Sequence, residues 1–351
     1  MTNLKETKIL SIKPLGKKST VYSFELDHGH VYVSNGFLSH NRCCVTGDTL
    51  VMTPRGELPI TSLKLKDTVL SYDTETKEVK TTWIKMRVAT LRPSHFKLEI
   101  GDSTLGITGD HPIYTQKGWA IIDDLAKANS YRDDGLNLAR ISTGDQVFSM
   151  LDSANCYERE LKSMTEINQS GPVYTISVDN LSTPNFFANG SLVHNTHDGA
   201  VRRGGALSPD TMIATPEGQI RLSEVKLGDT VESYDVSQSK SCTATVYALV
   251  ESIVGCYCNI QFTDGSCLKA TETHPLYEAT KGWVAIEPSY YADLTLNVLK
   301  IGDKLLSNNG SIHEVAAIDP IYGEMVQHTI GVEGTGTFIA NGFVVHDGYT
   351  S

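Results

Sequence analysis

The chain has 351 residues, enough for two or three domains with a sizeable core in each. Its composition, 40% hydrophobic and 20% charged, is that of an ordinary globular protein, and a formal net charge of -11 argues against a nucleic-acid-binding face. No apolar run approaches the roughly 20 residues that span a bilayer, and the N-terminus has no signal-peptide core. We therefore expect neither nucleic acid nor membrane as a partner, and a cytoplasmic location.

An internal repeat organises the sequence. Residues 53–60 (TPRGELPI) are echoed by residues 215–222 (TPEGQIRL), and residues 111–114 (HPIY) are echoed by residues 274–277 (HPLY). The end of the repeating unit occurs a third time near the N-terminus, around residues 34–36 (SNG). The chain therefore consists of a tail half-unit, a complete unit and a second complete unit.

The local pattern within each unit is typical of β-structure. Short runs rich in Val, Ile, Thr and Tyr alternate with Gly, Pro, Asn and Asp, which predicts an all-β fold. The best candidates for helix are two short segments, Ile121–Ala128 and Glu158–Met164. The predicted organisation is a segment like the C-terminal half of the unit (1–43), a complete domain (44–195), a linker (196–205), a second complete domain (206–347) and a tail (348–351).

The first complete unit carries reactive side chains at both ends and in its middle. A thiolate attacks carbonyl carbon readily, a histidine can move the proton, and an asparagine followed by a hydroxyl can cyclise and accept an acyl group. A cysteine or a histidine alone is more often structural than catalytic, so the combination of these residues is what indicates a reaction. The candidate site residues are Cys44 at the start, Thr108 and His111 in a Thr-x-x-His motif, and His194, Asn195 and Thr196 at the end.

These motifs together resemble the Hint (Hedgehog/intein) family. The signatures are the Cys-x-x-Gly-Asp-Thr opening, Thr-x-x-His, the Asn-Gly turn and the terminal His-Asn, which occur in the family's order. The first unit looks like a mini-intein without a homing endonuclease. The resemblance implies tandem, all-β, intein-like horseshoe domains, in each of which the two chain ends meet at one active site.

The resemblance also implies a reaction at the start of the first unit. The Cys44 thiol would attack the carbonyl carbon of Cys43 and convert that peptide bond to a thioester. His111 would take the proton, and Thr108 with nearby backbone N–H groups would stabilise the oxyanion and the distorted amide.

At the other end, Thr196 would accept the acyl group, and Asn195 would cyclise onto its own carbonyl with help from His194. The product would join Cys43 to Thr196, once per chain. The steps are intramolecular, so we expect no metal and no other cofactor.

Several positions depart from the family pattern. Splicing inteins usually have Asp where this unit has Thr175, and His where it has Pro184. The second unit has Ala206 at the nucleophile position and ends in Asp347 and Gly348, so it resembles a degenerate intein that does not splice.

Two alternatives follow from the same residues. The chain is either a self-processing module or a non-splicing structural or assembly protein built of Hint repeats, such as a phage virion component of the tail, baseplate or neck. In the second case the N-terminal half-unit would pair with neighbouring copies or other virion proteins by strand addition, and the location would be the virion.

A last cluster of residues concerns metal binding. Four cysteines of the second unit could supply thiolate ligands to zinc, although their spacing is not that of common zinc modules. Small buried cysteines in a β core are the simpler interpretation. These cysteines are Cys242, Cys256, Cys258 and Cys267.

Overall fold

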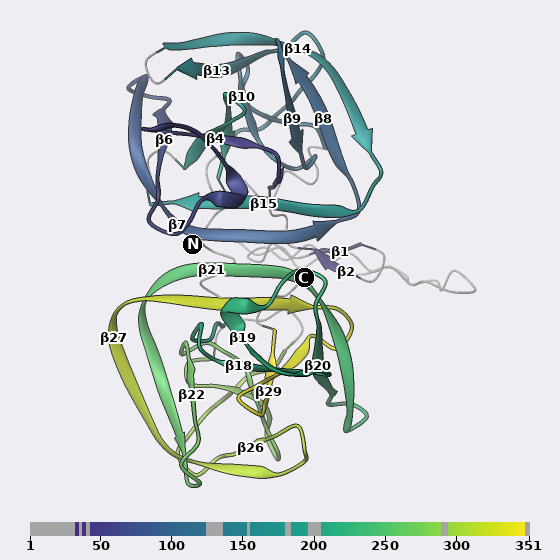
Figure 1. The fold of residues 1–351 in the computed structure, drawn as a ribbon, viewed down its shortest axis with the longest axis vertical. Helices are drawn as coiled ribbons and strands as arrows, with labels where there is room; N and C mark the ends of the chain where they lie inside the picture. Colours follow the sequence, from purple (N-terminus) through teal and green to yellow (C-terminus); the bar gives the residue numbers. More distant parts are fainter. Residues whose placement is uncertain are drawn as a thin grey trace, which may run out of the picture. The chain divides into compact units, whose positions relative to one another are not determined.

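The chain divides into two compact units, residues 1–40 with residue 351, and residues 41–350. In the first unit, strands β1 (Tyr32–Ser34) and β2 (Phe37–Ser39) form an antiparallel hairpin. All other described elements belong to the second unit, so the predicted division at residues 196–205 stays a prediction. The computed structural model (Figure 1) describes residues 32–34, 37–39, 43–123, 136–152, 155–179, 184–195, 205–288 and 294–347.

Strands dominate the described residues. The only other regular elements in these ranges are two short 3-10 helices, η1 (Ile60–Ser62) and η3 (Leu222–Glu224). The all-β fold class predicted from the sequence is confirmed. In this part of the chain, no helix has the length and apolar character needed to cross a membrane.

One of the two predicted helices is wrong. The segment Glu158–Met164 lies inside strand β14 (Asn155–Ile167), in which Arg159 and Leu161 are buried while their neighbours along the strand are exposed. This alternation has the period of two that a strand requires, and it is too short to be distinguished from a helical turn by sequence alone. The other predicted helix, Ile121–Ala128, extends into residues outside the described ranges.

The first repeat, residues 44–195, is a series of mostly antiparallel strands whose inward faces share one apolar core. Phe186, Leu98 and Ile107 are among its fully buried side chains. Besides β14, its strands are β3 (Val45–Thr46), β4 (Leu50–Thr53), β5 (Gly56–Pro59), β6 (Thr68–Asp73), β7 (Glu78–Arg92), β8 (His95–Ile100), β9 (Ser103–Ile107), β10 (Ile113–Thr115), β11 (Gly118–Ile121), β12 (Ala139–Arg140), β13 (Gln146–Asp152), β15 (Gly171–Val178), β16 (Asn185–Ala188) and β17 (Ser191–His194).

The second repeat, residues 206–347, follows a similar order of strands around its own core. In this core the rings of Phe262 and Phe343 stack, with their centroids 4.2 Å apart. Its strands are β18 (Met212–Thr215), β19 (Gly218–Arg221), β20 (Thr230–Asp235), β21 (Lys240–Phe262), β22 (Cys267–Ala270), β23 (Leu276–Glu278), β24 (Gly282–Ala285), β25 (Asn297–Val298), β26 (Lys304–Leu306), β27 (Ile312–Val332), β28 (Thr337–Ala340) and β29 (Phe343–His346).

Strand pairing brings the two ends of the first repeat to one turn. Strand β3, at the start of the repeat, pairs with β9 through Val45 and Ile107. Strand β17, at the end of the repeat, pairs with β10 through Val193 and Ile113. Because β9 and β10 are consecutive, residues 108–112 between them lie next to both ends of the repeat.

Strand β7 lies between two neighbours. Its residue Ala89 pairs with Tyr174 of β15 on one side and with Leu249 of β21 on the other, and both pairings are antiparallel. Strand β21 in turn pairs with β27 along most of its length. The two repeats are therefore joined by a continuous run of strands in the order β15, β7, β21 and β27.

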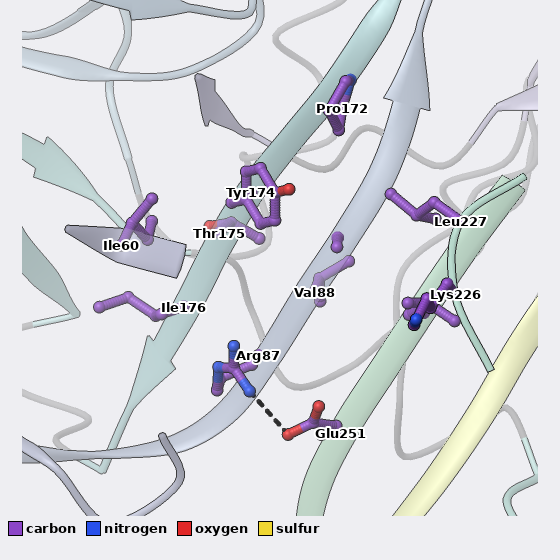
Figure 2. Close-up of a pocket in the computed structure, with 12 residues that line it drawn as sticks. Ile60, Arg87, Val88, Pro172, Tyr174, Thr175, Ile176, Lys226, Leu227 and Glu251 are labelled. Atoms are coloured by element: carbon purple, nitrogen blue, oxygen red, sulfur yellow. Dashed lines mark hydrogen bonds and ion pairs between the residues drawn. The ribbon is translucent and has the colours of Figure 1, made fainter. Parts of the chain in front are cut away.

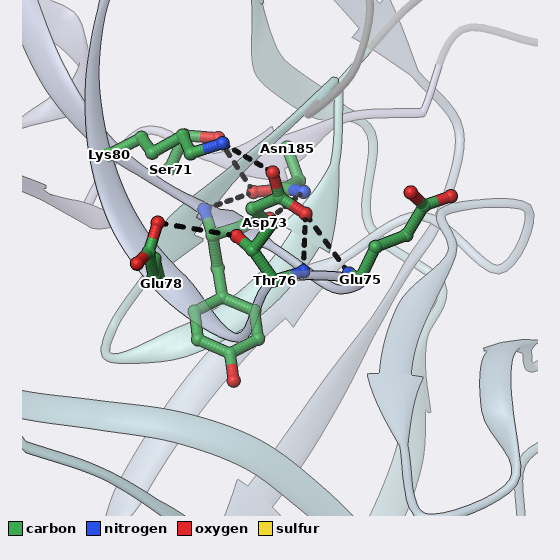
Figure 3. A network of polar contacts seen from close by, with 8 residues as sticks. Ser71, Asp73, Glu75, Thr76, Glu78, Lys80 and Asn185 are labelled. Atoms are coloured by element: carbon green, nitrogen blue, oxygen red, sulfur yellow. Dashed lines mark hydrogen bonds and ion pairs between the residues drawn. The ribbon is translucent and has the colours of Figure 1, made fainter.

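A polar network ties the β6–β7 hairpin to strand β16 (Figure 3). The Asn185 side-chain oxygen accepts hydrogen bonds from the Tyr72 N–H at 2.8 Å and from the Ser71 hydroxyl at 3.0 Å, and its amide nitrogen donates to the Tyr72 carbonyl at 2.8 Å. Beside it, Lys80 pairs with Asp73, whose carboxylate also accepts N–H groups of the hairpin turn. The pKa of Asp73 is lowered, mainly by the bond from Lys80.

The second repeat makes the same connection with a different residue. The Thr337 hydroxyl accepts from the Tyr234 N–H at 3.1 Å and donates to the Tyr234 carbonyl at 2.8 Å. The Ser233 hydroxyl lies 2.8 Å from it, as the Ser71 hydroxyl lies beside Asn185. A buried strand residue therefore satisfies both backbone groups of the hairpin tyrosine in each repeat.

We expect Asn185→Ala to lower the free energy of unfolding by about 3 kcal/mol, because it leaves the buried N–H and C=O of Tyr72 without partners. Asn185→Thr, which introduces the residue type of the second repeat, should recover part of this loss. Urea unfolding monitored by circular dichroism measures both. Asn297→Ala, at an exposed strand position, is the control and should cost less than about 1 kcal/mol. Equal losses in the Asn185→Ala and Asn297→Ala variants would contradict this role.

Candidate functional site

A threonine in the turn after β9 contacts the start of the first repeat. Cys43 and Cys44 directly precede β3, and both are buried. The Cys44 N–H donates to Thr108 Oγ1 at 3.0 Å, and the Cys44 carbonyl accepts from the Thr108 N–H at 2.9 Å and from its hydroxyl at 3.3 Å. Thr108 therefore contacts both the N–H and the C=O group of Cys44. Its hydroxyl accepts a hydrogen bond from the Cys44 nitrogen, which is the atom that would separate from Cys43 in the predicted reaction.

His111 lies in the turn between β9 and β10, and its N–H donates to the Thr108 carbonyl at 3.0 Å. Its ring is fully buried, and Nε2 is 2.8 Å from the carbonyl oxygen of His194. Because a carbonyl oxygen only accepts hydrogen bonds, Nε2 carries the proton. In the neutral ring, Nδ1 then has the lone pair, so this nitrogen is the one that can act as a base.

Burial determines the charge state of His111. It lowers the pKa of the imidazole to about 4, and contacts with the backbones of Cys44 and His194 act in the opposite direction. The ring is therefore neutral at pH 7. These two backbone contacts place it against both ends of the repeat.

The end of the first repeat is held by the backbone of the preceding strands. The His194 N–H donates to the Pro112 carbonyl at 3.0 Å, and the Asn195 N–H donates to the Pro184 carbonyl at 2.8 Å. Nδ1 of His194 is 2.7 Å from the Asn195 carbonyl oxygen and therefore donates to it. The rings of Trp119 and His194 are nearly perpendicular, with their centroids 5.1 Å apart. The imidazole thus polarises the carbonyl group of Asn195.

The buried side chain of Asn195 is fixed by residues before β16 and at the end of β15. In the amide orientation that gives each atom a complementary partner, the nitrogen donates to the Pro184 carbonyl at 2.6 Å. The oxygen then accepts from the Val178 N–H at 3.0 Å and the Ser177 hydroxyl at 3.2 Å. The amide of Asn195 is therefore held in one place rather than exposed to water.

The fold brings five of the six predicted site residues to one place. Thr108 contacts Cys44, the His111 ring contacts both Cys44 and His194, and His194 contacts Asn195, as described above. Thr196 lies outside the described residues. The catalytic role of all six stays a prediction.

Sequence reasoning missed Ser177 and the carbonyl of Pro184 as contacts of Asn195. Pro184 was noted only because it replaces a histidine of the family pattern, although its backbone carbonyl makes the contact. Ser177 is two residues after Thr175, and side chains two apart on a strand lie on the same face. That spacing is the signal that could have found it.

The second repeat has the same backbone arrangement without the thiol. The Ala206 N–H donates to Thr271 Oγ1 at 2.9 Å, and the Ala206 carbonyl accepts from this hydroxyl at 3.3 Å. Burial lowers the pKa of His274 to about 3. His346 packs against Trp283 at 5.2 Å, and its Nδ1 is 3.2 Å from Asp347 Oδ1. The frame is therefore present while the nucleophile and the terminal amide are absent.

The cysteines considered for zinc do not make a metal site in the described part of the chain, where no three His, Cys, Asp or Glu side chains are close enough to hold an ion. Cys242 is half-buried and Cys267 is exposed. Burial raises the pKa of Cys258 to about 11 and raises that of Cys256 as well. A raised thiol pKa opposes the thiolate form that zinc binds.

No model of a protein family and no curated protein sequence matches the chain. Among solved structures, it is similar to inteins and intein-like domains. These include the gp41-1 intein (26% identity, 41% of this chain and 98% of that one, TM-score 0.34), the DnaX mini-intein from Spirulina platensis (28%, 43% and 99%, 0.35) and a bacterial intein-like domain from Clostridium thermocellum (23%, 40% and 97%, 0.35).

We expect the thermal stability to fall as the pH is lowered from 7 to 5. The folded-state pKa values of His111 and His274 lie below the ordinary value of 6.5, so the unfolded chain binds more protons in this range. Each imidazole should cost roughly 2 kcal/mol by pH 5. Calorimetry of the full chain and of His274→Gln measures the effect, and the variant should show the shallower dependence. A melting temperature independent of pH over this range would contradict the burial of neutral imidazoles.

Proposed function

We propose that the first repeat is an intein-like self-processing module that excises residues 44–195 and joins Cys43 to Thr196. The observation that carries the proposal is the position of the His111 ring. One buried, neutral imidazole contacts the backbone of Cys44 at the start of the repeat and the carbonyl of His194 at its end. A single base is thereby available to both peptide bonds that must be broken.

In the first step, the Cys44 sulfur bonds to the carbonyl carbon of Cys43 and the bond from that carbon to the Cys44 nitrogen breaks. Nδ1 of His111 accepts the thiol proton and returns it to the departing amine. The Thr108 side-chain oxygen accepts a hydrogen bond from the Cys44 nitrogen, so the leaving group is oriented before the reaction begins.

In the later steps, the acyl group passes from sulfur to the Thr196 hydroxyl. The Asn195 side-chain nitrogen then bonds to the Asn195 carbonyl carbon, forming a succinimide, and the bond to Thr196 breaks. The His194 N–H that lies 2.7 Å from this carbonyl oxygen stabilises the negative charge that develops on it. The freed Thr196 amine finally displaces its own ester, which leaves a peptide bond to Cys43.

The replacements noted in the sequence change the surroundings of the site without removing a reacting group. Thr175 is buried where the family pattern has an aspartate, and Pro184 supplies a carbonyl rather than an imidazole. Both changes leave acid–base work to the two histidines, His111 and His194. We therefore expect slower processing than in an element that has every family residue.

A structural role is the second candidate, and the second repeat favours it. There Thr271 makes the same hydrogen bonds with the backbone of Ala206, although Ala206 has no thiol. Asp347 occupies the position that Asn195 has in the first repeat. A frame that persists without its reacting groups supports a scaffolding function for at least that part of the chain.

Intact-mass measurements of the full chain over time, with and without an added small thiol, separate the two candidates. If the first repeat processes itself, the excised residues 44–195 and the joined flanks should accumulate. Cys44→Ala should abolish joining and leave only cleavage after Asn195. Asn195→Ala should stop excision and leave a thioester that added thiol cleaves between Cys43 and Cys44.

Two equivalent threonines provide the matched control. Thr108→Ala should slow the first step by about tenfold or more, because the leaving amide loses its support. Thr271→Ala removes the same contact from the second repeat and should leave the rate unchanged. A single stable species with the mass of the full chain, under all conditions, would refute self-processing and support the structural role.

A further inference from the structure

Five residue pairs of two antiparallel strands join the two repeats. Residues 86–90 of β7 run antiparallel to residues 248–252 of β21, from the pair Met86 and Ser252 to the pair Thr90 and Ala248. The same residues of β7 use their other edge to pair with β15. Each repeat therefore supplies one strand edge to the other.

A small apolar cluster accompanies these pairs. We call it the junction cluster: its buried members are Met86 and Val88 from the first repeat, and Ala248 and Val250 from the second. Tyr247 packs against it. It is separate from the core of either repeat. The cluster combines side chains of both repeats, so separation would divide it and expose apolar surface to water.

Polar contacts fix the register at the edge of the junction. Arg87 pairs with Glu251 at 2.9 Å, as Figure 2 shows, and the Thr90 hydroxyl donates to the Tyr247 carbonyl at 3.2 Å. The ion pair borders a cavity of about 370 Å³ lined by both repeats, and its two side chains are 25% and 34% exposed. A partly solvated pair adds little affinity, so it selects the register while the junction cluster supplies the stability.

We propose that the second repeat is a binding partner of the first and holds it non-covalently when the chain between them is cut. An excised first repeat would then remain docked on β21 instead of being released. This goes beyond self-processing, because it assigns a function to the repeat that lacks the reacting groups and does not depend on which reaction cuts the chain.

The repeats should stay together because separating them would create unpaired strand edges. Pulling the repeats apart leaves residues 86–90 and residues 248–252 as open strand edges, with unpaired N–H and C=O groups beside an exposed apolar cluster. Adding a strand to such an edge is a common mode of protein recognition. The partner that matches β7 in register, charge and apolar pattern is the β21 segment of the same chain.

The test uses the full chain with processing blocked by Cys44→Ala and Asn195→Ala and with a specific protease recognition sequence inserted after Gly199. After complete cutting, size-exclusion chromatography with light scattering at low micromolar concentration measures the particle mass. We expect one particle with the mass of the uncut chain. Two separate species, or pairs of like halves, would overturn the proposal. Because processing is blocked, neither result depends on the proposed reaction.

A substitution in the junction cluster should release the halves. Val88→Lys places a charge in the buried cluster and should weaken the complex at least about tenfold. Val298→Lys makes the same change at an exposed position of β25 and should leave the complex intact. Circular dichroism of the uncut Val88→Lys chain shows whether it is folded. Equal retention of the two variants would overturn the assignment of the binding surface.

A charge exchange provides a second test in which both variants keep polar, partly exposed side chains. Arg87→Glu places two carboxylates together and should weaken the complex by roughly tenfold. Combining it with Glu251→Arg restores an opposite-charge pair and should recover most of the loss. Failure of the double variant to recover any binding, with both variants folded, would show that the halves are not held in the register of β7 and β21.

Discussion

The hydrogen bond from the His111 ring to the carbonyl of His194 is the contact on which the site depends. It connects the turn that binds the backbone of Cys44 with the last strand of the same repeat. The two ends of this repeat of 152 residues therefore meet at one imidazole. It also decides which ring nitrogen carries the proton. Burial then keeps the ring neutral, and Thr108 and Asn195 are held near an imidazole whose tautomer is already set.

The parts of the fold that depend on local pattern could be predicted from the sequence. Short runs rich in Val, Ile, Thr and Tyr between Gly, Pro, Asn and Asp predicted the all-β class. The Thr-x-x-His and His-Asn motifs identified residues that do lie together. The contacts of Asn195 with Ser177 and of Asn185 with Tyr72 could not be predicted, because they depend on which strands become neighbours. The junction of β7 with β21 is of the same kind. Nothing within a single strand shows which other edge will pair with it.

The two repeats separate the frame of the site from its chemistry. Thr108 and Thr271 make the same contacts with the backbone of the first residue of each repeat, although one is a cysteine and the other an alanine. The backbone arrangement is therefore stable without the thiol. Likewise, an amide at Asn185 and a hydroxyl at Thr337 serve the same hairpin. Side chains can change while strand pairing and backbone satisfaction keep the fold.

The complete burial of Cys44 determines which small molecules can react with its thiol. Alkylating agents, peroxides and small disulfides reach a sulfur atom only where solvent does, and in the folded chain Cys267 is exposed to them while Cys44 is not. The thiol is therefore vulnerable to these reagents during synthesis, before the strands close around it. Folding therefore protects the sulfur from these reagents.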